Sequence, residues 1–196
     1  MKKNPFFICI VIFFCLTKLS GMSQENPNIP ATNSLWGAAI NDNAATIASL
    51  VEAGAKVDQP CGNPQHTPLY WAAAFGSIEA IQMLLSLHAN PNLRLTKDDE
   101  TPLVIAAIIG YPDIVRLLLE YNADSQLTCQ WEFKCDLQSA NQTALELAQK
   151  QRRNLQMFST GCDALKELYA GTIQKLDAVI TILEERERIL PSWLFS

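Results

Sequence analysis

The chain has 196 residues, with 15 basic and 20 acidic side chains, so its formal net charge is −5 at neutral pH. Nucleic-acid affinity comes largely from lysine and arginine contacts to phosphate, and after residue 23 the only adjacent basic pair is Arg152-Arg153. The composition therefore excludes a nucleic-acid-binding protein and disfavours adhesion to anionic membranes.

The N-terminus has the three regions of a secretory signal peptide. Lys2 and Lys3 precede an apolar run at residues 6–16, and the small residues Gly21 and Ser23 follow. Eleven apolar residues are too few to span a bilayer, which takes about 20. We expect cleavage after Ser23, with Gly21 as the competing site and a retained anchor as the alternative.

Export changes the charge of the mature protein. Removing Lys2, Lys3 and Lys18 with residues 1–23 leaves 12 basic against 20 acidic residues, a net charge near −8. Residues 24–32 then form a linker. The expected location is the periplasm of a bacterium, or the outside of the cell, with no stable membrane insertion once the signal is removed.

Three stretches of the chain repeat the same residues at an interval of 34. A fixed period between 20 and 50 residues is typical of stacked supersecondary units, each of which needs neighbours to bury its apolar face. The repeated positions are Leu35, Leu69 and Leu103, the alanine pairs 38–39, 72–73 and 106–107, the apolar pairs 50–51, 84–85 and 118–119, and Ala55, Ala89 and Ala123.

Each copy also carries the signals of helix ends. Thr67 and Thr101 suit a helix N-cap because Pro68 and Pro102 follow, at the first helical position where a missing N–H costs nothing. The second helix of each copy should end in a left-handed residue, a place that favours Gly or Asn. Gly54 and Asn122 fit this place, and His88 departs from it but is expected to be tolerated there.

These repeated segments resemble the ankyrin repeat. The clearest copies begin Thr67-Pro68-Leu69 and Thr101-Pro102-Leu103, while residues 35–58 form a degenerate first copy and Thr143-Ala144-Leu145 opens a fourth. The resemblance implies an all-α solenoid of helix pairs with protruding finger loops. Its domain would span residues 33–190, in four repeats at 33–66, 67–100, 101–142 and 143–190, the last of them a cap.

The third finger is longer than the others. The step from Leu103 to Leu145 is 42 residues, and the excess falls at residues 125–141, where Trp131 and Phe133 alternate with polar residues. This alternation predicts a short β-hairpin with both aromatic side chains on one face. The two aromatic side chains either contact a partner or fold back over the core.

Four cysteines remain after export, and an oxidising compartment favours disulfides. Cys129 and Cys135 flank the aromatic residues of one loop, so we expect a disulfide between them. In an ankyrin stack Cys61 and Cys162 would lie on opposite sides, which makes a bridge between them improbable. The alternative is four thiols.

The C-terminal part predicts two lengthened helices. The first runs from about residue 143 to 158 and the second from 163 to about 189, with apolar residues on one face of the second. Repeat proteins need such a cap because the last unit has no neighbour. The tail at 191–196 is expected to lie over this cap rather than to dock elsewhere. The apolar residues are Leu165, Leu168, Leu176, Val179, Ile180 and Leu183.

No catalytic constellation emerges from the residues, and we expect a protein that is not an enzyme, with no cofactor and no metal. The two histidines, His66 and His88, lie apart from any nucleophile motif, and no Cys-x-x-Cys spacing suggests zinc. The acidic run at residues 98–100 is expected to be a solvated turn.

The ankyrin resemblance implies a binding face. In that pattern the two residues after each alanine pair face the concave groove, and a contiguous apolar row there would indicate a contact site. The alternative is that the row is covered internally. The expected partner-binding residues are Ile40, Phe75, Ile108 and Ile109 from this row, Tyr70 at the place where the family often has His, and Trp131 and Phe133 of the third finger.

Two hypotheses about function follow. The first is a non-catalytic exported protein that binds another protein, either as an accessory of a periplasmic enzyme or as an immunity protein against a toxin. The second is a small-ligand carrier or enzyme with a pocket near the long C-terminal helices. A co-purifying protein would support the first, and a co-purifying small molecule the second.

Overall fold

The helices follow one another in pairs along the chain. The computed structural model describes residues 34–61, 65–95, 99–129, 142–159 and 163–189, all within one compact unit at residues 31–196. The four described pairs correspond to the four expected repeats. They are α2 (Leu35–Ile40) with α3 (Ala44–Glu52), α4 (Pro68–Phe75) with α5 (Ile78–Ser86), α6 (Pro102–Ile109) with α7 (Pro112–Glu120), and α8 (Ala144–Ser159) with α9 (Asp163–Ile189).

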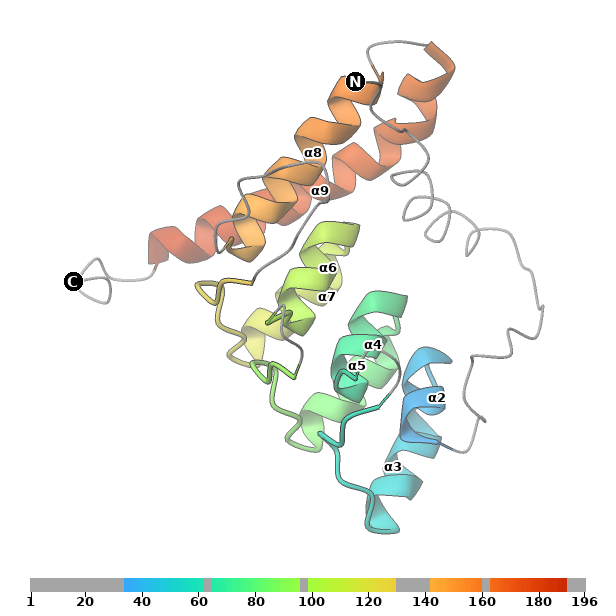
Figure 1. Ribbon diagram of the computed structural model, residues 1–196. Coiled ribbons are helices and arrows are strands. Elements are labelled where there is room, and N and C mark those ends of the chain that lie inside the picture. Colours follow the sequence, from blue (N-terminus) through green and yellow to red (C-terminus); the bar gives the residue numbers. More distant parts are fainter. Residues whose placement is uncertain (1–33, 62–64, 96–98, 130–141, 160–162, 190–196) are drawn as a thin grey trace. The chain divides into compact units, whose positions relative to one another are not determined.

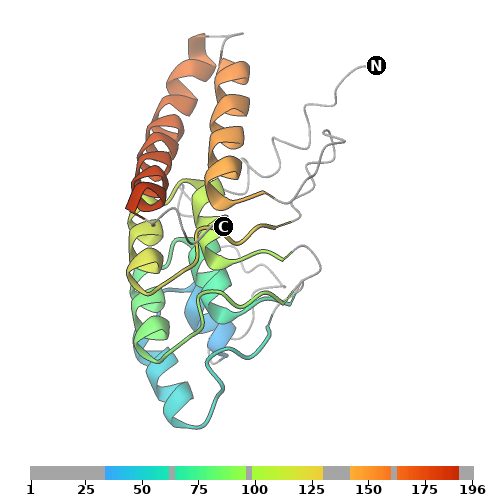
Figure 2. The same ribbon diagram turned by 90° about the vertical axis from the view of Figure 1, so that its left-hand side faces the viewer.

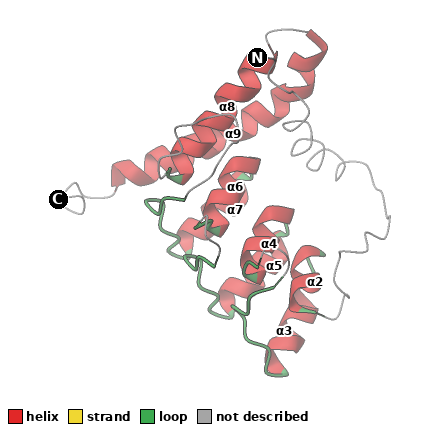
Figure 3. Ribbon diagram, in the orientation of Figure 1, coloured by secondary structure: helices red, strands yellow, loops and turns green. Residues whose placement is uncertain are grey.

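The pairs stack in two layers (Figure 1). The first helices form one layer, in which α2 contacts α4, α4 contacts α6 and α6 contacts α8. The second helices form the other, from α3 through α5 and α7 to α9. Figure 2, turned by 90°, shows the two layers as neighbouring columns. The loops that join one pair to the next lie on one side of the helices (Figure 3). The all-α solenoid is confirmed.

The first helix of each of the first three repeats begins at a side-chain N-cap. The Thr67 side chain accepts a hydrogen bond from the backbone N–H of Tyr70, and Thr101 does the same for Val104. In the degenerate first repeat, Ser34 takes this role and accepts from the N–H of Gly37. A side-chain cap satisfies one of the free N–H groups at a helix start, so each repeat fixes its own first turn.

Left-handed residues stand where the pattern requires them. Gly54, His88 and Asn122 follow the second helices with φ of 99°, 64° and 62°. This confirms the helix ends predicted from the sequence, including the departure at His88.

Asp42 also has a positive φ, of 56°, and its carboxylate accepts a hydrogen bond from the N–H of Ala80 at 2.8 Å. A loop residue of the first repeat thus holds the start of α5.

The core lies between the two layers. Both residues of every alanine pair are fully buried, which lets the helices approach closely. The second helices contribute leucine and isoleucine side chains whose burial is the main stabilising term. Among the largest fully buried side chains are Ile47, Ile81, Leu84, Ile114 and Leu118.

The C-terminal pair is longer than the others, as expected. Thr143 and Glu146 begin α8 with a capping box, since each side chain accepts a hydrogen bond from the other residue's N–H, at 3.4 and 2.9 Å. On α9, Leu176, Val179 and Leu183 are fully buried. Ile180 is half-buried and Leu168 is 51% exposed, so among the described side chains of α9 the fully buried ones begin at Leu176.

Several predictions fall outside the described residues. These include the signal at 1–23, the linker at 24–32 and the tail at 191–196. Among the described residues, no helix is both long enough and apolar enough to cross a bilayer. Also outside the described part are Trp131, Phe133, Cys135 and Cys162, and the side chain of Leu165.

Candidate partner-binding surface

Three aromatic rings form a row across the first helices. Trp36 of α2 lies with its ring centroid 5.6 Å from that of Trp71 on α4, and Trp71 lies 6.3 Å from Phe75. Trp71 and Phe75 are four residues apart, so one helix turn brings them to the same face. All three side chains are partly exposed. We call Trp36, Trp71 and Phe75 the aromatic row.

The two indole groups of the row differ in their hydrogen bonds. Trp71 Nε1 donates to the carbonyl of Cys61 at 3.0 Å, which ties α4 to the first finger. Trp36 Nε1 is buried and has no hydrogen-bond partner among the described residues. A buried N–H without a partner costs about 1–3 kcal/mol. The hydrogen bond to Cys61 therefore fixes the indole of Trp71, whereas an additional hydrogen-bond acceptor would stabilise the indole of Trp36.

The predicted concave-face residues divide into two groups. Phe75 and Ile109 are partly exposed, but Ile40 and Ile108 are buried, at 8% and 5% exposure. The expectation of exposure is wrong for these two because consecutive helix residues are rotated by about 100° and cannot share one face. In the first and third repeats the residue directly after the alanine pair packs inward and the next one keeps contact with solvent, whereas in the second repeat Ala74 and Phe75 are both partly exposed.

Tyr70 also belongs to the interior. It is 7% exposed, and its hydroxyl donates a hydrogen bond to Glu100 Oε2 at 2.7 Å. His66 stacks on its ring at a centroid distance of 3.7 Å, and His66 Nε2 lies 3.5 Å from the same carboxylate oxygen. These three residues form a buried polar network between the first and second fingers. Tyr70 is therefore removed from the solvent-facing set.

The acidic run before α6 is more than a solvated turn. The Glu100 side chain is only 13% exposed because it lies against His66 and Tyr70, whereas Asp99 pairs with Arg94 at 3.6 Å near the surface. Asp98 lies outside the described residues. Burial, the nearby carboxylate of Glu100 and the hydrogen bond to that carboxylate all raise the pKa of Tyr70. The phenol therefore stays protonated and donates the hydrogen bond. The network orders both finger bases.

The base of the first finger is closed by backbone pairing. The Cys61 N–H donates to the carbonyl of His66 at 2.8 Å, and the His66 N–H donates back at 3.0 Å. The Cys61 thiol donates to the His66 carbonyl at 3.4 Å, and burial raises the pKa of this thiol to about 12. Cys61 is thus a protonated structural thiol.

Polar side chains also link each finger to the next. The Asp58 carboxylate accepts from the Asn90 N–H at 3.1 Å, and Asn92 Oδ1 accepts from the Asp124 N–H at 2.8 Å. Burial raises the pKa of Asp58, and the hydrogen bond from Asn90 opposes this shift. The described parts of the fingers are therefore held in register, which gives a partner an ordered surface.

An antiparallel backbone bridge joins the two ends of the third finger. Cys129 and Gln142 exchange backbone hydrogen bonds of 3.0 and 3.1 Å, and Cys129 is 1% exposed. The finger tip, with Trp131, Phe133 and Cys135, lies outside the described residues. The disulfide between Cys129 and Cys135 stays a prediction.

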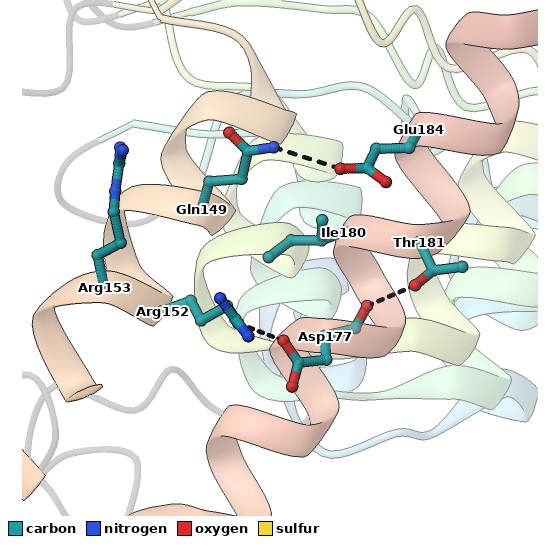
Figure 4. Close-up of a pocket in the computed structure, with 7 residues that line it drawn as sticks. All are labelled: Gln149, Arg152, Arg153, Asp177, Ile180, Thr181 and Glu184. Carbon is teal, nitrogen blue, oxygen red and sulfur yellow. Dashed lines mark hydrogen bonds and ion pairs between the residues drawn. The ribbon is translucent and has the colours of Figure 1, made fainter.

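A hollow of about 370 Å³ lies between α8 and α9, where the ligand-carrier hypothesis would need a pocket (Figure 4). Two contacts join the helices there: Arg152 pairs with Asp177, and the Gln149 amide donates to Glu184 at 3.5 Å, while Arg153 points away from α9. Figure 4 shows the earlier repeats behind this pair of helices, so the hollow lies on the end face of the stack. A polar end face is what a terminal repeat requires.

Two features of the described residues bear on catalysis and on metal binding. His66 is 2% exposed and covered by Tyr70, so a dissolved substrate has no access to its ring. Within the described parts of the chain, no group of three His, Cys, Asp or Glu side chains could hold a metal ion.

Sequence reasoning missed Trp36, Trp71, His66 and Glu100. The spacing of Trp71 and Phe75 on one helix was a usable signal for an aromatic face. The link between Tyr70 and Glu100 spans 30 residues, and only the stacking of adjacent repeats brings them together.

Comparison with known proteins identifies the repeats. The family described as ankyrin repeats (3 copies) matches residues 12–94 and 35–129, which together cover more than half of the chain. The palmitoyltransferase Hip14 of Drosophila melanogaster is 35% identical over 75 residues, or 38% of this chain. The chain spans only 12% of the length of that relative, and the match lies in the repeat region. Ankyrin repeats are non-catalytic units that generally mediate contacts between proteins.

Proposed function

Because this chain belongs to the ankyrin repeat family, we propose that it is an exported, non-catalytic protein that docks another protein through its first helices and finger loops. The observation that carries the proposal is the aromatic row with its continuation at Ile109 on α6. Aromatic side chains are enriched in the residues that dominate interface energies. The row stands beside finger bases that are already ordered, which lowers the entropy lost on binding.

The expected partner is a protein of the same compartment. The mature chain would carry a net charge near −8 after loss of residues 1–23, so partners with basic surface patches would be attracted at long range. The role is that of an accessory subunit of a periplasmic enzyme or of an immunity protein that blocks a toxin. Both roles require a stable complex between folded proteins.

The test compares single variants of the row in a co-purification and titration experiment. Phe75→Ser and Ile109→Ser should each weaken binding of the co-purified partner by about 1–3 kcal/mol, because each removes partly exposed apolar contact area. The thermal midpoint should change little. The control is Ile78→Ser on α5, a 40% exposed apolar residue on the other layer, which should leave the affinity unchanged.

Two results would count against this proposal. If Phe75→Ser and Ile109→Ser lower the thermal midpoint by many degrees and bind normally once folded, Phe75 and Ile109 are core residues. Equal weakening by Ile78→Ser would show that the contact is not made by the first helices.

A further inference from the structure

The layer of second helices carries a hollow of its own. It has a volume of about 470 Å³ and draws its lining from three successive repeats, on the layer opposite the aromatic row. The lining residues are Ala44 of α3, Glu79, Gln82, Met83 and Ser86 of α5, Leu117 and Glu120 of α7, and Tyr121 just after it.

The lining combines apolar side chains with carboxylates. Met83 and Leu117 are half-buried and Tyr121 is 43% exposed. Glu79 and Glu120 are exposed, and neither has an ion-pair partner among the described residues. The lining contains no Lys, Arg or His. The hollow therefore offers apolar contact area next to two carboxylates that form no ion pair within the described part of the chain.

The junctions before α5 and α7 differ in the size of one residue. At the junction of the first two repeats, Ser77 stands before α5 and donates to the Ile40 carbonyl at 3.1 Å. The next junction has Tyr111 instead, and its ring lies so close to Gly76 that a Cβ there would be 3.1 Å away. α5 and α7 also contact each other less extensively than α3 and α5 do.

We propose that this hollow docks a segment of another protein that presents Lys or Arg beside an aliphatic side chain. The stem of a long basic side chain packs against apolar surface while its charged end remains near the rim. At the rim it would meet Glu79 and Glu120, forming charge-assisted hydrogen bonds. A patch with an apolar centre and a polar rim has the anatomy of a protein interface. This contact is independent of the aromatic row on the other layer.

The probe is a fluorescent helical peptide with Lys and Leu at positions that share one face, titrated by anisotropy against the full chain. The double variant Glu79→Gln/Glu120→Gln should bind it about fivefold to tenfold more weakly, the scale expected for two solvent-accessible ion pairs. Tyr121→Ser should also weaken binding. Glu52→Gln is the matched control, since Glu52 is exposed on α3 but outside the lining. Far-UV circular dichroism confirms that each variant is folded.

Three outcomes would overturn the proposal. Equal weakening by Glu52→Gln would mean that the peptide responds to overall acidity. Equal binding of a peptide with Glu in place of Lys would mean that charge plays no part. A large effect of Phe75→Ser would place the peptide on the first helices, whereas an unchanged affinity for this variant supports the second-helix hollow.

Discussion

At the scale of single residues, one position of the repeat takes three different roles. Tyr70, Val104 and Glu146 all stand three residues after the capping threonine. Tyr70 bonds to Glu100 of the next finger, Val104 is buried at 1% exposure, and Glu146 reaches back to the N–H of Thr143. The helix start is the same in each repeat, but the link to the neighbouring finger exists only at Tyr70.

The Tyr70 link should have a measurable effect on stability. Tyr70→Phe leaves the buried Glu100 carboxylate without one of its donors, so we expect a loss of about 1–3 kcal/mol in the free energy of unfolding. Tyr121→Phe, at a residue that is 43% exposed, should change it by less than about 0.5 kcal/mol. Urea unfolding followed by circular dichroism measures both. Equal midpoints for the two variants would show that the network contributes nothing to stability.

The cysteines of the third finger give a second prediction at this scale. A disulfide between Cys129 and Cys135 would close a small loop and stabilise the fold by about 2 kcal/mol in the chain-entropy view. Peptide mapping without reductant, on protein isolated from the exported fraction, should recover the two residues in one linked fragment. Alkylation of both thiols in that material would refute the pairing.

At the scale of elements, α9 differs along its length. Its C-terminal half packs on α7 and α8 through Leu176, Val179 and Leu183, while Leu168 nearer its start is exposed. Leu176 also lies against the inter-helix turn of the third repeat, since a Cβ on Gly110 would be 3.4 Å from its side chain. Among the described side chains, those from Leu176 onward therefore form the buried contact of the cap.

Two leucines on this helix test the division. Leu176→Ala should lower the free energy of unfolding by about 2–5 kcal/mol, because it leaves a cavity in the core. Leu168→Ala removes the same atoms from a side chain that is 51% exposed and should cost less than about 1 kcal/mol. Thermal unfolding compares the pair. A larger loss for Leu168→Ala would mean that the N-terminal half of α9 is the packed part.

At the scale of the whole molecule, each layer presents a different surface. The first helices carry the aromatic row beside the finger bases, and the second helices carry a hollow lined by apolar side chains and by two carboxylates without an ion pair among the described residues. The end face at α8 and α9 has a mostly polar hollow in which Arg152 pairs with Asp177 and Gln149 with Glu184. A stack of this kind can contact partners on two layers without any change in its core.

Export is the prediction that concerns the chain as a whole. Protein recovered from the exported fraction should begin at Gln24, because the basic start and the apolar run at residues 6–16 predict removal of the first 23 residues. N-terminal sequencing determines the first residue. A protein that retains Met1 and is found only in the cytoplasm would refute export.

Much of the fold could be read from the residues because its signals are local. The 34-residue period, the capping threonines with their prolines, and the left-handed positions at Gly54, His88 and Asn122 act within a few residues of each helix end. The order of helices and the long C-terminal pair follow from these signals. Each repeat specifies its own helices and needs its neighbours only for burial.

The binding surfaces were decided by tertiary structure. Stacking brings His66 and Glu100 together across 34 residues and sets Trp36 against Trp71. It also buries Ile108 while leaving Ile109 at the surface. The sequence by itself determined the repeats, their helices and the acidic net charge, because periodicity and caps depend on residues close in the chain and net charge depends on composition alone. Which side chains remain exposed depends on the rotation of each helix against the next repeat, and only packing sets that rotation.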